Sequence, residues 1–161
     1  DICRMDPRYK TYSFGAKVKD IAQDLFQMPS GFKDRTLLTQ IGTKMREIDP
    51  DIWIKYVLRH IHSEHCLIDD LRYQNEYEAL VKHGWTIIQL HVPKDVQTER
   101  ICRKYPDTYH DHLSNQNHDS EANHFDWLPG KEPSLIIDTS TDYKKIHQQV
   151  YSFIQKHEYN R

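Results

Sequence analysis

Short apolar runs alternating with helical segments constrain the fold of this chain more than any other feature. Three runs are long enough for buried strands, at residues 65–69, 85–92 and 134–138. Apolar residues recur at helical spacing within residues 14–26, 37–45, 53–61, 77–81, 95–104 and 141–157. Alternation of this kind predicts an α/β domain with a parallel sheet and helices on both faces.

The ends of several helices can be placed from local signals. Residues 28–31 contain Pro and Gly and are expected to stop the first helix. Asp49 is expected to cap a third helix, with Pro50 at its first position. His83 and Gly84 are expected to end the helix that follows the first apolar run.

Residues 105–133 are polar and contain no apolar run, so we expect a long connection that is either a functional lid or a disordered segment. Several of the eleven His lie there, between His110 and His124. A structural zinc site and an exposed polar loop are the two alternatives. Cys102 has no CxxC partner and the spacing fits no standard finger, so we assign no metal ligands.

Composition excludes several classes of function. The 161 residues suit one soluble domain, with 37% hydrophobic and 29% charged residues. A net charge of −2 argues against broad binding to nucleic acid. No apolar stretch approaches the roughly 18–20 residues of a membrane span. The three Cys lie far apart in the sequence, so we expect a reducing, cytoplasmic location.

Chemistry is concentrated after the first predicted strand. Asp69 and Asp70 end the apolar run, Arg72 follows at once, and Glu76 lies in the next helix. Ligands of open α/β sheets bind at the carboxyl ends of the strands, where a carboxylate can orient a hydroxyl or a magnesium-bound water and an Arg can bind phosphate. An ordinary ion pair at the end of a strand is the alternative.

The pattern Asp70, Arg72, Asn75 and Glu76, followed by an apolar helix, a Gly and a strand, resembles the deoxynucleoside monophosphate kinases of phages and large DNA viruses. Further segments resemble the same family in the right order, and the resemblance runs from about Tyr12 to the C-terminus. They are residues 12–19, 37–43, 51–55 and 118–121.

The resemblance implies a three-layer P-loop kinase fold in a single domain, and transfer of the γ-phosphoryl group of ATP, with Mg²⁺, to a deoxynucleoside monophosphate. Arg35 and Arg72 would hold the monophosphate. Trp53 would contact the base, although its place on an apolar helix face equally suits core packing. Asp70 and Glu76 would contact the sugar or order the acceptor.

A lid of about residues 95–133 is also implied. Arg100 and Arg103 would bring positive charge to the transferred phosphoryl group, as catalytic residues together with Asp70 and Arg72. A solvated helix face is the alternative for both lid arginines. Ser120 would contact the nucleotide. The expected partners are small-molecule nucleotides, with a homodimer allowed, and neither nucleic acid nor a membrane.

One part of the family pattern is missing from these residues. A P-loop reads G-x-x-x-x-G-K-[S/T], and none of the five glycines belongs to such a motif. The family places its first strand and this loop before the region that matches residues 1–11, so we expect them upstream of Asp1. Two alternatives are a nucleotide-binding remnant without activity, and a related kinase for phosphomevalonate or dephospho-coenzyme A.

Overall fold

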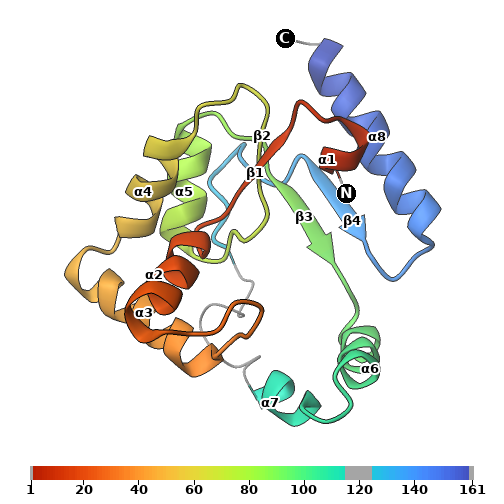
Figure 1. Ribbon diagram of the computed structural model, residues 1–161. Coiled ribbons are helices and arrows are strands. Elements are labelled where there is room, and N and C mark those ends of the chain that lie inside the picture. The colour runs from red at the N-terminus through yellow and green to blue at the C-terminus, as the bar shows by residue number, and fades with distance from the viewer. Residues whose placement is uncertain (1, 115–124, 160–161) are drawn as a thin grey trace. The chain divides into compact units, whose positions relative to one another are not determined.

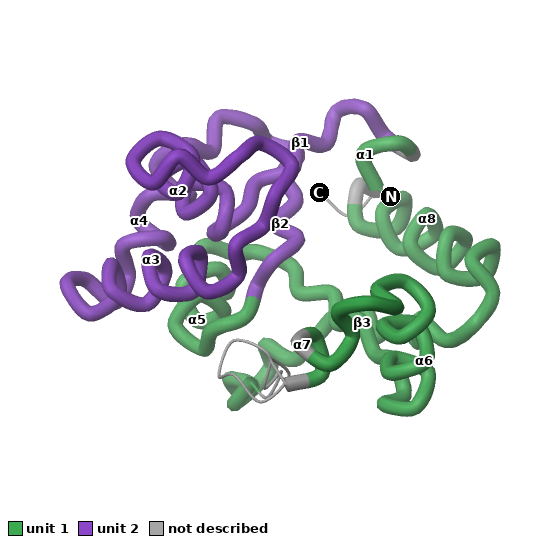
Figure 2. Tube along the Cα trace, turned by 60° about the horizontal axis from the view of Figure 1, so that its bottom comes forward, with its two compact units in different colours: residues 1–5, 72–161 green, residues 6–71 purple. Residues whose placement is uncertain are grey.

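The computed structural model describes residues 2–114 and 125–159. The chain divides into two compact units, which Figure 2 shows in different colours. One unit comprises residues 6–71, and the other comprises residues 1–5 together with residues 72–161.

The unit of residues 6–71 contains a parallel pair of strands. β1 (Lys10–Tyr12) pairs with β2 (Cys66–Ile68), and the two lie side by side in Figure 1. β2 confirms the strand predicted at residues 65–69. β1 was not predicted, because Lys10 and Thr11 are exposed and the strand therefore has no apolar run.

Three helices connect β1 to β2 and form the core of this unit. α2 (Ala16–Phe26) packs against α3 (Arg35–Ile48), and α3 packs against α4 (Ile52–His60). These helices confirm the first three predicted helical periods. The buried apolar side chains of the unit are Phe14, Val18, Ala22, Met28, Ile41, Trp53, Ile54 and Val57.

The third helix begins later than its sequence signals predicted. Asp49 is the C-cap of α3, and its carboxylate accepts hydrogen bonds from the backbone N–H of Asp51 (3.1 Å) and from Nζ of Lys55 (2.9 Å). The N-cap of α4 is Asp51. The assignment of Asp49 as N-cap and Pro50 as first helical residue is wrong, because the Asp49 carboxylate closes a turn before the helix starts.

The second unit also contains a parallel pair of strands. β3 (Ile88–His91) pairs with β4 (Leu135–Asp138), from Ile88 opposite Leu135 to His91 opposite Asp138. The strand predicted at residues 134–138 is confirmed. The one predicted at residues 85–92 is shorter at its start, because the N–H of Trp85 donates to the carbonyl of Leu80 (3.0 Å) and still belongs to the turn that ends α5.

This unit also contains five helices within its described residues. They are α5 (Gln74–Lys82), α6 (Lys94–Lys104), α7 (Tyr109–Ser114), α8 (Tyr143–Tyr159) and the short α1 (Ile2–Met5). α8 packs against both β4 and α1. The buried apolar side chains are Tyr77, Leu80, Val81, Ile87, Ile137, Val150 and Ile154.

Part of the long connection predicted at residues 105–133 is helical. α7 (Tyr109–Ser114) lies within this stretch. Its short polar sequence, YHDHLS, has too few apolar residues to reveal a helical period. Residues 115–124 lie outside the described part of the chain.

The segment after those residues is fastened to α5. The side-chain amide of Gln74 donates to the carbonyl of Asp126 (3.0 Å) and accepts from the N–H of Asp126 (3.1 Å). The hydroxyl of Tyr77, which is fully buried, donates to the carbonyl of Lys131 (2.9 Å) and accepts from the N–H of Leu128 (3.0 Å). α5 thereby holds the chain that leads into β4.

The α/β class and the parallel pairing are confirmed. The difference from the predicted single sheet is that the strands of the described residues form two separate two-stranded sheets. In the described part of the chain, no helix is both long enough and apolar enough to cross a membrane.

The Tyr77→Phe substitution tests the fastening of residues 125–131. It removes one hydroxyl and leaves a carbonyl and an N–H without their partner, so we expect the free energy of unfolding to fall by about 1–3 kcal/mol. Urea unfolding measures this change. Tyr151→Phe, on the exposed side of α8, is the control and should change stability by less than about 0.5 kcal/mol. Equal stability of Tyr77→Phe and wild type would contradict the role of the hydroxyl.

Candidate functional site

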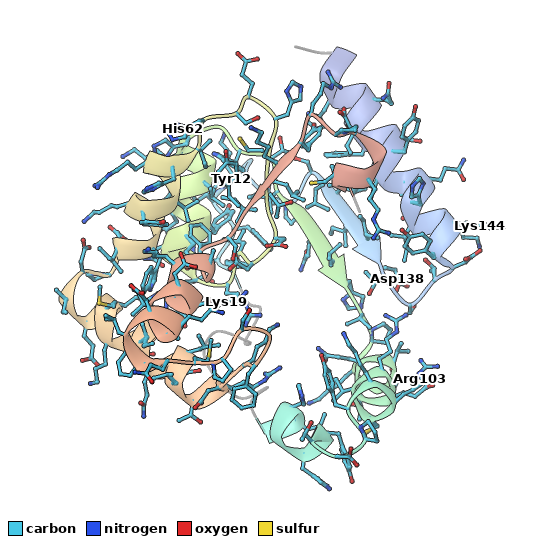
Figure 3. The ribbon with its side chains drawn as sticks, viewed as in Figure 1. Tyr12, Lys19, His62, Arg103, Asp138 and Lys144 are labelled. Carbon is cyan, nitrogen blue, oxygen red and sulfur yellow. The ribbon has the colours of Figure 1, made fainter. Side chains whose placement is uncertain are left out.

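In the unit of residues 6–71, both strands end at the same edge of the sheet. Tyr12, labelled in Figure 3, pairs with Ile68 as the last residue of each strand. Residues 13–15 continue from β1, and Asp69 and Asp70 continue from β2. Ligands of parallel sheets bind outside such an edge, so these residues are the first candidates for a site.

The Asp70 carboxylate binds the residues that follow β1. Its Oδ2 accepts from the hydroxyl of Ser13 (2.6 Å) and the N–H of Gly15 (2.8 Å), and its Oδ1 accepts from the N–H of Phe14 (2.9 Å). An ionised acceptor makes such bonds about twice as strong as neutral ones. We call Asp70 and residues 13–15 the Asp70 bracket.

Gly15 allows this close approach. It is the N-cap of α2 and has no side chain with which to cap the helix. A Cβ at this position would lie 3.3 Å from Oδ2 of Asp70, which is tighter than ordinary van der Waals contact. Because Gly15 has no side chain, the carboxylate of Asp70, which is distant in sequence, can reach the start of α2.

Trp53 is a core residue in this structure. Its side chain is only 2% exposed, and its Nε1–H donates to the carbonyl of Gly42 in α3 (3.2 Å). The burial agrees with core packing, one of the two interpretations that the sequence left open. A nucleotide base would reach the indole ring only if Trp53 left this packing.

Arg35 is the first residue of α3 and is exposed. Asp34 caps the helix by accepting the N–H of Leu37 (2.9 Å), which fixes the backbone from which Arg35 extends. An exposed guanidinium at a capped helix N-terminus is suited to binding an anion.

In the second unit, Glu76 is buried, with 2% of its surface exposed. Its Oε2 accepts the backbone N–H groups of Arg72 (3.0 Å) and Tyr73 (3.1 Å), which precede α5. The structure thus brings Arg72 and Glu76 together, with Glu76 fixing the backbone of Arg72 rather than facing solvent. The Arg72 residue itself is exposed.

The two lid arginines contact residues that the sequence did not single out. Nη2 of Arg100 donates to the carbonyl of Thr139 (2.7 Å), in the loop that leads from β4 to α8. Arg103 projects from α6 (Figure 3) and lies 3.9 Å from the Glu99 carboxylate, in an exposed pair. Ser120 lies outside the described residues.

The end of β4 carries a second hydrogen-bonded carboxylate. Oδ1 of Asp138 (Figure 3) accepts the hydroxyl (2.6 Å) and the N–H (2.8 Å) of Ser140. The Ser140 hydroxyl, then its N–H, and more weakly the charges of His91 and Arg100 hold the pKa of Asp138 below its ordinary 3.8.

The described residues do not fit a phosphate cradle or a protein-built metal site. The 161 residues contain no P-loop motif, and the described ones contain no group of three His, Cys, Asp or Glu side chains placed to hold a metal ion. Mg²⁺ in kinases is held largely by substrate phosphates and water, so it does not require such a group. Comparisons with models of protein families, with curated proteins and with solved structures gave no match.

Sequence reasoning missed Ser13, Gly15 and Thr139 as partners of the predicted site residues. For Ser13 and Gly15, the local signal was Gly15 itself. A Gly at the beginning of a helix often marks the close approach of another group. Nothing in the sequence around Thr139 indicates that its carbonyl binds Arg100.

The Ser140→Ala substitution should raise the pKa of Asp138 toward 3.8, because it removes the hydroxyl that lowers this pKa most. Side-chain carboxyl NMR across a pH titration measures the value. Since the folded pKa is lowered, the bond stabilises the protein fully above pH 3.8, and this contribution is lost as the pH falls through the lowered pKa. Ser152→Ala on α8 is the control. An unchanged Asp138 pKa in Ser140→Ala would contradict the assignment.

Proposed function

We propose that the protein is a nucleoside or deoxynucleoside monophosphate kinase, which transfers the γ-phosphoryl group of ATP to the phosphate of the acceptor. The residues of this chain are assigned to the acceptor and to the transferred phosphoryl group, because the sequence contains no P-loop motif for the other phosphates of ATP. The kinase-like sequence pattern of residues 70–76 is the starting point of the proposal.

The observation that carries the proposal is the position of this sequence pattern relative to the strands. It begins directly after β2, at the carboxyl edge of a parallel strand pair, which is where α/β proteins bind ligands. Its acidic members are not free surface charges. Asp70 holds residues 13–15, and the buried Glu76 holds the backbone of Arg72. The pattern therefore has a built framework and an exposed arginine, as a phosphate-binding segment requires.

Arg72 is the proposed phosphate ligand in its unit, and Arg35 is the candidate in the unit of residues 6–71. Both residues are exposed, and both extend from backbone that a carboxylate fixes, namely Glu76 for Arg72 and Asp34 for Arg35. A guanidinium forms paired hydrogen bonds with phosphate oxygens. Arg100 and Arg103 on α6 are proposed to supply positive charge near the transferred group, as positioned cations do in phosphoryl transfer.

The test is a coupled kinase assay on the protein of the native open reading frame. dAMP, dCMP, dGMP and dTMP are assayed separately with ATP and Mg²⁺. We expect ADP formation that depends on at least one of them. Binding of a monophosphate without transfer would instead indicate an inactive remnant. Transfer only to phosphomevalonate or dephospho-coenzyme A would indicate a related kinase, and no transfer or binding at all would refute the proposal.

Arg72→Lys tests the proposed phosphate ligand. Lys keeps the charge but cannot form the planar pair of hydrogen bonds. The loss of a charge-assisted bond of about 1.5–3 kcal/mol should weaken monophosphate binding about ten- to a hundredfold. Isothermal titration measures the affinity, and thermal unfolding measures the midpoint.

Arg59→Lys is the matched control for Arg72→Lys, because Arg59 is an exposed residue in the last turn of α4. Its affinity and thermal midpoint should equal those of wild type. If Arg72→Lys instead keeps its affinity while the midpoint drops, Arg72 is a structural residue and is not a phosphate ligand.

A further inference from the structure

The Asp70 carboxylate already accepts hydrogen bonds from other residues of the protein, which limits its binding of a ligand. Oδ2 already accepts two hydrogen bonds, from Ser13 and Gly15, and Oδ1 accepts one from Phe14. A carboxylate oxygen has about two lone-pair sites, so Oδ2 is fully used by the protein. Direct binding of a sugar hydroxyl or a metal ion through Oδ2 would require the bracket to open.

The bracket instead fixes a point of the chain close to Arg72. Only Leu71 separates Asp70 from Arg72, so their Cα atoms lie within about 7 Å of each other by chain geometry alone. Holding Asp70 against residues 13–15 therefore fixes the chain two residues before Arg72. Within the second unit, Glu76 accepts the backbone N–H of Arg72 and so fixes the start of the segment that carries its side chain.

We propose that Asp70 is a positioning residue for the acceptor phosphate, acting through Arg72 by means of its hydrogen bonds to Ser13, Phe14 and Gly15. This inference rests on the proposed function, since it concerns the acceptor that Arg72 binds. It assigns no contact with substrate to Asp70, and it adds Ser13 and Gly15 to the residues on which monophosphate binding depends.

The bracket explains why its members have these side chains. Asn at position 70 would replace one acceptor oxygen by an NH₂ group, which cannot accept a hydrogen bond, so at least one of the three bonds would be lost. Ala at position 13 would remove one donor and leave the two backbone N–H groups in place. Ala at position 15 would place a Cβ 3.3 Å from Oδ2. The three substitutions should therefore disturb one arrangement to different degrees.

The experiment measures KM for the preferred monophosphate and for ATP in wild type, Asp70→Asn and Ser13→Ala, using the native full-length protein. We expect Asp70→Asn to raise KM for the monophosphate about tenfold and to leave KM for ATP within twofold. Ser13→Ala should raise the same KM by a smaller factor, and Ser13→Thr, which keeps the hydroxyl, should restore it. The double variant should resemble Asp70→Asn alone, because both changes break one arrangement.

Asp24→Asn on α2 is the matched control, since it removes the same charge from an exposed residue of the same unit. It should leave both KM values unchanged. A purely structural role would lower the amount of active enzyme, and so kcat, without raising KM for the monophosphate. If Asp70→Asn does not fold, Ser13→Ala and Ser13→Thr decide the question alone.

The outcomes separate the two proposals. An active wild type in which Asp70→Asn and Ser13→Ala leave KM for the monophosphate unchanged, or raise both KM values equally, overturns the positioning role and leaves the kinase proposal standing. A wild type that neither binds nor phosphorylates any of the four deoxynucleoside monophosphates overturns both.

Discussion

The three hydrogen bonds of the Asp70 carboxylate are the interaction on which the unit of residues 6–71 depends. They join the chain after β2 to the chain that enters α2, across a sequence separation of 55–57 residues. Two strands of three residues each provide few ladder bonds of their own. A charged acceptor at their carboxyl ends adds strong bonds where the pairing ends, and it also fixes where α2 begins.

In the second unit, the end of β4 carries a related arrangement that is built from residues close together in sequence. Asp138, the last residue of β4, accepts the hydroxyl and N–H of Ser140, only two positions away, whereas Asp70 binds a distant segment. Across from it, the N–H and hydroxyl of Thr139 both donate to the carbonyl of His91 at the end of β3 (2.8 and 3.0 Å). In both units a carboxylate and a hydroxyl shape the loop at the carboxyl edge, and a side chain also joins the ends of the two strands: Asp70 in one unit and Thr139 in the other.

The sequence predicted the elements whose apolar pattern is complete and missed those without one. β2 and β4 were found because their residues form apolar runs, and α3 was found because Ile41 and its neighbours recur at helical spacing. β1 and α7 were missed because they are short and largely polar. For the site, local pattern placed Asp70, Arg72 and Glu76 at the end of a strand. It could not indicate that Asp70 binds Ser13 or that Trp53 is buried, since both depend on residues distant in sequence.

The long separations between bonded residues have a consequence for how the protein forms during synthesis. Tyr77 binds Lys131 across 54 positions, and Phe14 binds Asp70 across 56. At a translation rate of roughly 5–20 residues per second, β1 would remain unpaired for roughly 3–11 s after its synthesis, until β2 and Asp70 follow. The exposed side chains of Lys10 and Thr11 suit that interval, because a polar strand is less prone to pair with other chains than an apolar one. The polar residues that prevented the prediction of β1 would thus make the nascent chain less prone to pair with other chains.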